Sequence, residues 1–136
     1  MLCPKILNFD KRSIIYEAQF LRLSGEGTAL LIAAKEFGAK GFGVEIDPVR
    51  FLFSKFILKT NGLSNKVTIK RGNLFNQDIS KADVIFVYLV PKTLERLLPK
   101  FKKELKKGTK IISYRYEMNL SLKEYDKENE IRLYII

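Results

Sequence analysis

Strand-like and helix-like segments alternate along most of this chain, and this alternation limits the fold more than any other feature. Short apolar runs closed by turn residues are typical of strands, whereas longer segments with an apolar residue every three or four positions are typical of helices. Strands separated by single helices pair in parallel, and their crossover helices cover both faces of the sheet. The expected strands are residues 13–17, 41–46, 67–71, 82–90 and 109–116, and the expected helices are residues 28–37, 47–60 and 92–106.

Two of the helices carry clear signals in the sequence. Asp47-Pro48 matches an N-cap followed by the first helical position, so Asp47 is interpreted as a helix cap rather than as a ligand. The later helix repeats apolar residues at helical spacing, namely Leu94, Leu97, Leu98, Phe101 and Leu105. The apolar run 84–90 before it is typical of a central strand that is covered on both faces.

The C-terminal part breaks the alternation. Residues 120–125 and 131–136 are both strand-like, and the five polar residues 126–130 join them with no helix between. Such a pair predicts a hairpin at one edge of the sheet. The fold class that follows is α/β: a Rossmann-like, doubly wound, mostly parallel sheet with a C-terminal antiparallel hairpin. Its 136 residues fit a single domain, 1–136.

Composition excludes several kinds of chemistry. The chain has no histidine, which removes Ser-His-Asp hydrolysis, histidine-ligated metals and histidine general bases. Cys3 is its single cysteine, so no internal disulfide or cysteine-based zinc site can form, and no metal is expected. No apolar run approaches the roughly 18–20 residues that a membrane-spanning helix needs. The start of the chain is too short in its apolar part for a signal peptide, so we expect a cytoplasmic protein with no membrane partner.

The charge is strongly positive, with 25 Lys plus Arg against 15 Asp plus Glu and a formal net charge of +10. Such an excess attracts polyanions, which are nucleic acid, acidic proteins or an anionic membrane surface. Nucleic acid is therefore a candidate partner. A group of lysines near the last crossover could contribute, although a solvated helix face explains them equally: Lys100, Lys102, Lys103, Lys106, Lys107 and Lys110.

The candidate site follows from the fold, because ligands of such sheets bind outside the carboxyl ends of the strands. Gly25 and Gly27 lie in a small-residue turn before an expected helix, where a ligand can approach the backbone closely. Glu45 ends the second crossover strand, where a carboxylate can accept both hydroxyls of a ribose. Asn73 follows the next strand, and its amide can bind an adenine edge, although a plain turn residue is the alternative.

Together, Gly-x-Gly, Glu and Asn at successive strand ends resemble the class I S-adenosylmethionine-dependent methyltransferases. Within that class the chain looks closest to the small archaeal protein-lysine methyltransferases and their mitochondrial relatives. The segments that carry the resemblance are 25–27, 33–39, 43–47, 70–75, 89–91 and 105–113.

The resemblance implies an S-adenosylmethionine-dependent methyltransferase that modifies lysine side chains of a protein substrate. The implied cofactor-binding residues are Glu17, Gly25, Gly27, Glu45, Asn73 and Leu74. Tyr88 is the implied catalytic candidate, since it could orient the amine. The segment Tyr88-Leu89-Val90-Pro91 stands where enzymes that methylate exocyclic base amines have Asn/Asp-Pro-Pro-Tyr, which argues against base N-methylation.

The first loop departs from the family pattern of acid-x-Gly-x-Gly-x-Gly. Counting back from Gly27 puts Leu21 at the acid and Leu23 at the first glycine. In the alternative that we prefer, Glu17 is the acid, because it ends an apolar run, and Gln19–Leu23 replaces one small residue. The bulky side chains of this segment are then expected to occupy the methionine half of the cofactor site. This leaves two alternatives open: a degenerate, weakly cofactor-binding interaction protein, and an RNA methyltransferase or RNA-binding protein.

Overall fold

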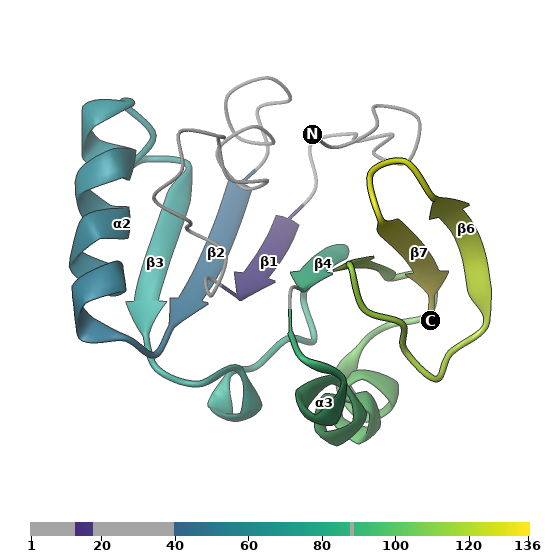
Figure 1. Ribbon diagram of the computed structural model, residues 1–136. Helices are drawn as coiled ribbons and strands as arrows, with labels where there is room; N and C mark the ends of the chain where they lie inside the picture. The colour runs from purple at the N-terminus through teal and green to yellow at the C-terminus, as the bar shows by residue number, and fades with distance from the viewer. Residues whose placement is uncertain (1–12, 18–39, 88) are drawn as a thin grey trace.

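The computed structural model describes residues 13–17, 40–87 and 89–136, and these residues form a seven-stranded sheet flanked by helices (Figure 1). The strands lie in the order β3-β2-β1-β4-β5-β7-β6. The elements are β1 (Ser13–Glu17), β2 (Lys40–Glu45), α2 (Pro48–Thr60), β3 (Val67–Arg71), the short 3₁₀ helix η2 (Leu74–Asn76), β4 (Val84–Val87), α3 (Pro91–Glu104), β5 (Lys110–Tyr114), β6 (Leu122–Asp126) and β7 (Ile131–Ile135).

The sheet is parallel from β3 to β5, and the strand order reverses beside β1. β1 pairs in parallel with β2 on one side and with β4 on the other. The chain then continues outward in both directions, to β3 and to β5. Right-handed crossovers therefore place α2 and α3 on opposite faces. This is the predicted doubly wound sheet, and the point where the order reverses is where a ligand is expected.

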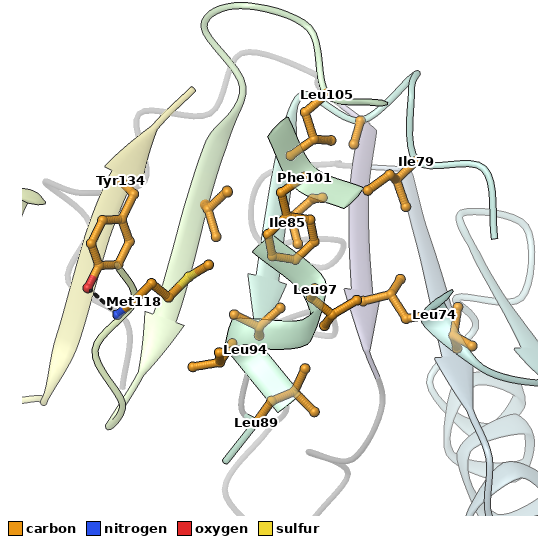
Figure 2. Packing of buried hydrophobic residues seen from close by; sticks show 14 residues of the cluster. Leu74, Ile79, Ile85, Leu89, Leu94, Leu97, Phe101, Leu105, Met118 and Tyr134 are labelled. Carbon is orange, nitrogen blue, oxygen red and sulfur yellow. Dashed lines mark hydrogen bonds between the residues drawn. The ribbon is translucent and has the colours of Figure 1, made fainter. Parts of the chain in front are cut away.

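The C-terminal hairpin lies at one edge, as predicted. β7 pairs antiparallel with β5, and β6 pairs antiparallel with β7 as the outermost strand. Tyr134 of β7 is fully buried, and its hydroxyl accepts a hydrogen bond from the Met118 backbone N–H at 3.0 Å (Figure 2). The hairpin is thus fixed to the sheet by a buried polar contact as well as by its ladder.

The α3 face holds a continuous apolar cluster. Leu94, Leu97 and Phe101 of α3 are buried against Ile85 of β4 and its neighbours on the sheet (Figure 2). Every residue of β4 is buried, as the apolar run predicted. The strand is shorter than the expected 82–90, however, because the chain turns into α3 at Pro91 and Val90 becomes the N-cap.

The remaining boundaries agree with expectation within a few residues, and α2 begins as predicted. Asp47 caps α2: its Oδ1 accepts hydrogen bonds from the backbone N–H groups of Val49 and Arg50. The expected helix 28–37 lies outside the described residues. In the part of the chain that is described, no helix is long and apolar enough to cross a membrane.

Candidate functional site

Three of the predicted site residues lie at the same edge of the sheet. Glu17 ends β1 and pairs in register with Val44, one residue before Glu45 at the end of β2. The ladder between β2 and β3 continues for one more bond, because the Gly72 N–H donates to the backbone oxygen of Glu45 at 3.0 Å. This bond holds Asn73, the next residue, beside the end of β2. The carboxyl edge around β1 thus brings together Glu17, Glu45 and Asn73.

Glu45 has the most unusual environment of the three. Its residue surface is only 1% exposed. Oε1 accepts a hydrogen bond from the Asp47 N–H at 2.9 Å, but Oε2 is buried and has no hydrogen-bond partner among the described residues. Burial raises the pKa of the Glu45 carboxyl, while the Asp47 N–H and the charge of Arg50 act in the opposite direction. A buried acceptor without a donor is unfavourable, so this atom is suited to a ligand that brings a donor.

Asn73 fills the turn position that the sequence allowed as its alternative. Its Oδ1 accepts a hydrogen bond from the Phe75 N–H at 3.0 Å and caps η2. Its Nδ2 donor makes no hydrogen bond to any residue that the structure describes. The cap therefore fixes the direction of the side chain and leaves the donor for a ligand. Leu74, also predicted in the site, has its side chain fully buried in the core, so it supports η2 from below.

Two residues beside this edge were missed by the sequence analysis. Ile46 follows Glu45 directly and is 57% exposed, which is unusual for isoleucine. Phe75 is half-buried, and the Arg96 guanidinium of α3 lies 4.9 Å from its ring centre. Both offer apolar surface near Glu45 and Asn73. The signal for Ile46 was its position after a strand end, where an apolar side chain has no strand neighbour to cover it.

The other predicted residues lie outside the described part of the chain. These are Gly25, Gly27 and Tyr88, together with the altered segment Gln19–Leu23. The strand assignment nevertheless bears on that segment. β1 ends at Glu17 between β2 and β4, so the strand that precedes the loop is the one that our preferred alignment requires.

The basic group near α3 is partly neutralised. Lys100 pairs with Glu104 at 2.7 Å, and Lys106 pairs with Asp83. Lys102, Lys103 and Lys107 are exposed. In the described ranges, no group of three or more Asp, Glu, Cys or His side chains is arranged to hold a metal ion. The chemistry of this edge is therefore that of one buried carboxylate, one amide and adjacent apolar surface.

Comparison with known proteins agrees with this geometry. A protein-lysine N-methyltransferase of Saccharolobus islandicus (strain REY15A) is 32% identical over 120 residues, which cover 82% of this chain and 74% of that protein. An ATP synthase lysine N-methyltransferase of Caenorhabditis elegans is 25% identical over 95 residues, 70% of this chain and 49% of that protein. The chain thus spans about half the length of the second relative.

Solved structures show the same architecture. The crystal structure of an RNA methyltransferase from Salinibacter ruber, in complex with S-adenosyl-L-homocysteine, superposes with a TM-score of 0.82 at 29% identity and covers 92% of this chain and 80% of that one. The family model of the ANTKMT methyltransferase domain matches residues 24–123, which include β2 to β5 and the site residues Glu45 and Asn73. The chain belongs to the ANTKMT methyltransferase domain family.

Proposed function

We propose that the chain binds S-adenosylmethionine at the carboxyl edge of β1, β2 and β3 and transfers its methyl group to lysine side chains of a protein. Membership of the methyltransferase family supports the reaction type. The names of the Saccharolobus and Caenorhabditis relatives support lysine as the acceptor. The compartment, expected to be the cytoplasm, is part of the proposal.

The buried Oε2 of Glu45 is the observation that carries the proposal. A ribose presents two adjacent hydroxyl donors, and a carboxylate at the end of the second crossover strand can accept both. Here Oε1 already has one donor, and Oε2 has none among the described residues. A nucleoside would supply the missing bond. The exposed Ile46 side chain would cover one side of the base, and the Asn73 Nδ2 would donate to its edge.

The transfer itself needs positioning more than acid–base groups. S-adenosylmethionine, when bound, supplies an electrophilic methyl group. The neutral lysine nitrogen forms the new N–C bond as the S–C bond breaks, and the amine then loses a proton to water. Alignment at near-attack distance is the main requirement, so the lack of histidine is no obstacle. We assign the orientation of the amine to Tyr88, which follows β4.

Calorimetric titration with S-adenosylmethionine and S-adenosyl-L-homocysteine tests the binding step. Both should bind, and Glu45→Ala should weaken both while circular dichroism stays unchanged. Transfer is tested with a methyl-labelled cofactor and a mixture of proteins, followed by detection of N-methyllysine after hydrolysis. Binding without transfer to any protein would contradict the lysine acceptor.

The degenerate alternative is tested through the altered loop. If Gln19–Leu23 occupies the methionine half of the site, adenosine should bind measurably but S-adenosylmethionine only weakly. Replacement of these five residues by one glycine should then tighten binding of the whole cofactor. Micromolar binding and protein methylation by the unaltered chain would exclude this alternative.

RNA methylation is the second candidate function. The likeness to the Salinibacter RNA methyltransferase and the net charge of +10 favour it. Labelled methyl groups in RNA are removed by nuclease, whereas those in protein are removed by protease. Label that is lost only on nuclease treatment would make RNA the acceptor.

A further inference from the structure

The outward face of α2 is apolar along its length. Val49, Leu52, Phe53 and Phe56 are 75%, 65%, 37% and 63% exposed. Their spacing of i, i+3, i+4 and i+7 places them on one side of the helix. The opposite side holds the buried Ser54 and Leu58. We call the four exposed residues the α2 stripe.

Exposure of this extent is specific to α2 among the two long helices described. On α3, the buried side carries Leu94, Leu97 and Phe101, and the outer side carries Lys102 and Lys103. α2 lies at the outer end of the sheet beside β3 (Figure 1). Contiguous exposed apolar patches of this kind mark interaction sites on soluble domains. The α2 stripe is therefore a surface that needs an occupant.

The charges beside the stripe are all positive. Lys55 and Lys59, four residues apart, are exposed along one border, and Arg50 is exposed on the other side. The Lys55 ammonium lies 5.1 Å from the Phe51 ring centre, at the junction between the stripe and the buried side. α2 contains no acidic residue. The stripe thus joins an apolar ridge to basic borders.

We propose that the α2 stripe binds peripherally to an anionic membrane surface. A helix with phenylalanine and leucine on one side and lysine beside them is the pattern of interfacial membrane binding. Basic side chains close to anionic lipids add attraction, and the net charge of +10 acts in the same direction. A second copy of the chain would instead bring like charges together along both borders. The ridge is convex, so a flat surface can accept it without a matching groove.

This proposal concerns contact with the surface and not a membrane-spanning segment. The sequence alone led us to expect no membrane partner, because apolar residues at helical spacing are ordinarily a core face. The structure instead buries the Ser54–Leu58 side of α2. Only the observed rotation of the helix about its axis shows which apolar residues face outward.

A tryptophan reporter tests the contact directly, since the chain has no tryptophan of its own. Phe56→Trp places a single fluorophore in the stripe, and Lys103→Trp places one on the outer side of α3 as a matched control. With vesicles of phosphatidylcholine and phosphatidylglycerol, the Phe56→Trp emission should shift to the blue, and the control emission should stay constant. A Phe56→Trp spectrum that does not respond to these vesicles would overturn the proposal.

Vesicle sedimentation separates the apolar and charged contributions. In the double variant Leu52→Ser/Phe56→Ser, each truncation should lower partitioning about tenfold. Lys55→Gln/Lys59→Gln should lower it about fivefold per lysine, whereas Lys102→Gln/Lys103→Gln on α3 should have a much smaller effect. Pure phosphatidylcholine vesicles should bind more weakly, and added salt should weaken binding to the mixed vesicles.

Two outcomes would contradict the proposal even if the basic protein sediments with anionic vesicles. Equal losses from the two lysine pairs, with none from Leu52→Ser/Phe56→Ser, would show attraction by overall charge alone. A lipid-free dimer that Leu52→Ser/Phe56→Ser dissociates would make a second copy the occupant. Circular dichroism of each variant checks that the fold is retained.

Discussion

The two long helices of the described chain, α2 and α3, are crossovers of the same sheet but differ in almost every other respect. α3 has one buried side and one charged side, and no side chain caps its N-terminus, where Val90 stands. α2 has apolar residues on both sides, and its N-terminus is held by Asp47 and by the contact of the Asp47 N–H with Glu45. α3 therefore serves mainly the core, whereas α2 links the core, the candidate site and an exposed surface.

The difference teaches where each helix obtains its stability. The apolar side of α3 fills the cluster around Ile85 and Ile111, so tertiary packing holds it in place. α2 buries few residues against the sheet, and its fixed start depends on hydrogen bonds at the end of β2. A change in the core should therefore affect α3 most, and a change at the strand end should affect α2 and the site together.

The largest effect is expected for Phe101→Ala. Phe101 is fully buried at the centre of the α3 cluster (Figure 2), and removal of a buried phenylalanine ring costs about 3–5 kcal/mol. Urea denaturation followed by circular dichroism measures the loss in the free energy of unfolding. A loss below about 1 kcal/mol would show that α3 is not packed as described.

Glu45→Ala is expected to weaken cofactor binding by about 1.5–3 kcal/mol, the range for lost hydrogen bonds to a charged group. Titration calorimetry measures the change, with the unfolding curve as the control for the fold. An unchanged affinity would remove Glu45 from the site. Because hydroxyl donors favour the ionised carboxylate, affinity in the wild type should also fall as the pH decreases through the pKa of Glu45.

Glu45→Gln separates binding from stability. Burial raises the Glu45 pKa in the folded chain above its ordinary value of 4.5, so the folded state holds its proton to higher pH than the unfolded state. The wild type then loses stability as the pH rises from the ordinary pKa to the raised one. Relative to wild type, Glu45→Gln should gain stability over that range and remain more stable above it, although it binds the cofactor less well. Parallel stability curves for the two proteins would contradict the raised pKa.

The sequence predicted the parallel sheet, the hairpin and the starts of both helices, because periodicity and capping residues act locally. The predicted bounds of β1 and β3 match the observed ones, and Asp47 was identified as a cap. Glu17, Glu45 and Asn73 were predicted to share an edge, and the register of β1, β2 and β3 confirms it. Their roles in cofactor binding stay predictions.

The sequence could not show features that depend on which way a side chain faces. The missing partner of Glu45 Oε2 follows from the packing around the end of β2, and the exposure of Ile46 follows from the turn into α2. Nothing in the spacing of the α2 residues shows which apolar side contacts the sheet. The fourth strand was predicted too long for a similar reason, because apolar Val90 belongs to the start of α3.

Asp47→Ala should destabilise the protein by about 1 kcal/mol, the usual cost of a lost N-cap. The Asp47 Oδ1 accepts from Val49 N–H at 2.8 Å and from Arg50 N–H at 3.0 Å, and both bonds would be lost. Thermal or urea unfolding measures the change. Because the Asp47 backbone N–H still donates to Glu45, cofactor affinity should fall much less than in Glu45→Ala.

The matched control uses the uncapped helix. Val90 has the extended backbone of an N-cap residue but no oxygen to accept a bond from α3. Val90→Ser should therefore raise the free energy of unfolding, by somewhat less than Asp47→Ala lowers it. A loss of stability in Val90→Ser would mean that the exposed valine makes a packing contribution greater than that of a cap.

The smallest effect is expected for Phe56→Ala, which makes the same chemical change as Phe101→Ala on the outward side of α2. Phe56 is 63% exposed, so little of its apolar surface is returned to water when the ring is removed. Alanine also favours the helix more than phenylalanine does, by up to about 0.7 kcal/mol, which offsets the lost contacts. The free energy of unfolding should change by less than about 0.5 kcal/mol, as at other surface positions. A cost of about 2 kcal/mol or more in dilute, lipid-free protein would show that the α2 stripe is covered in solution, and the contrast between the two helices would no longer hold.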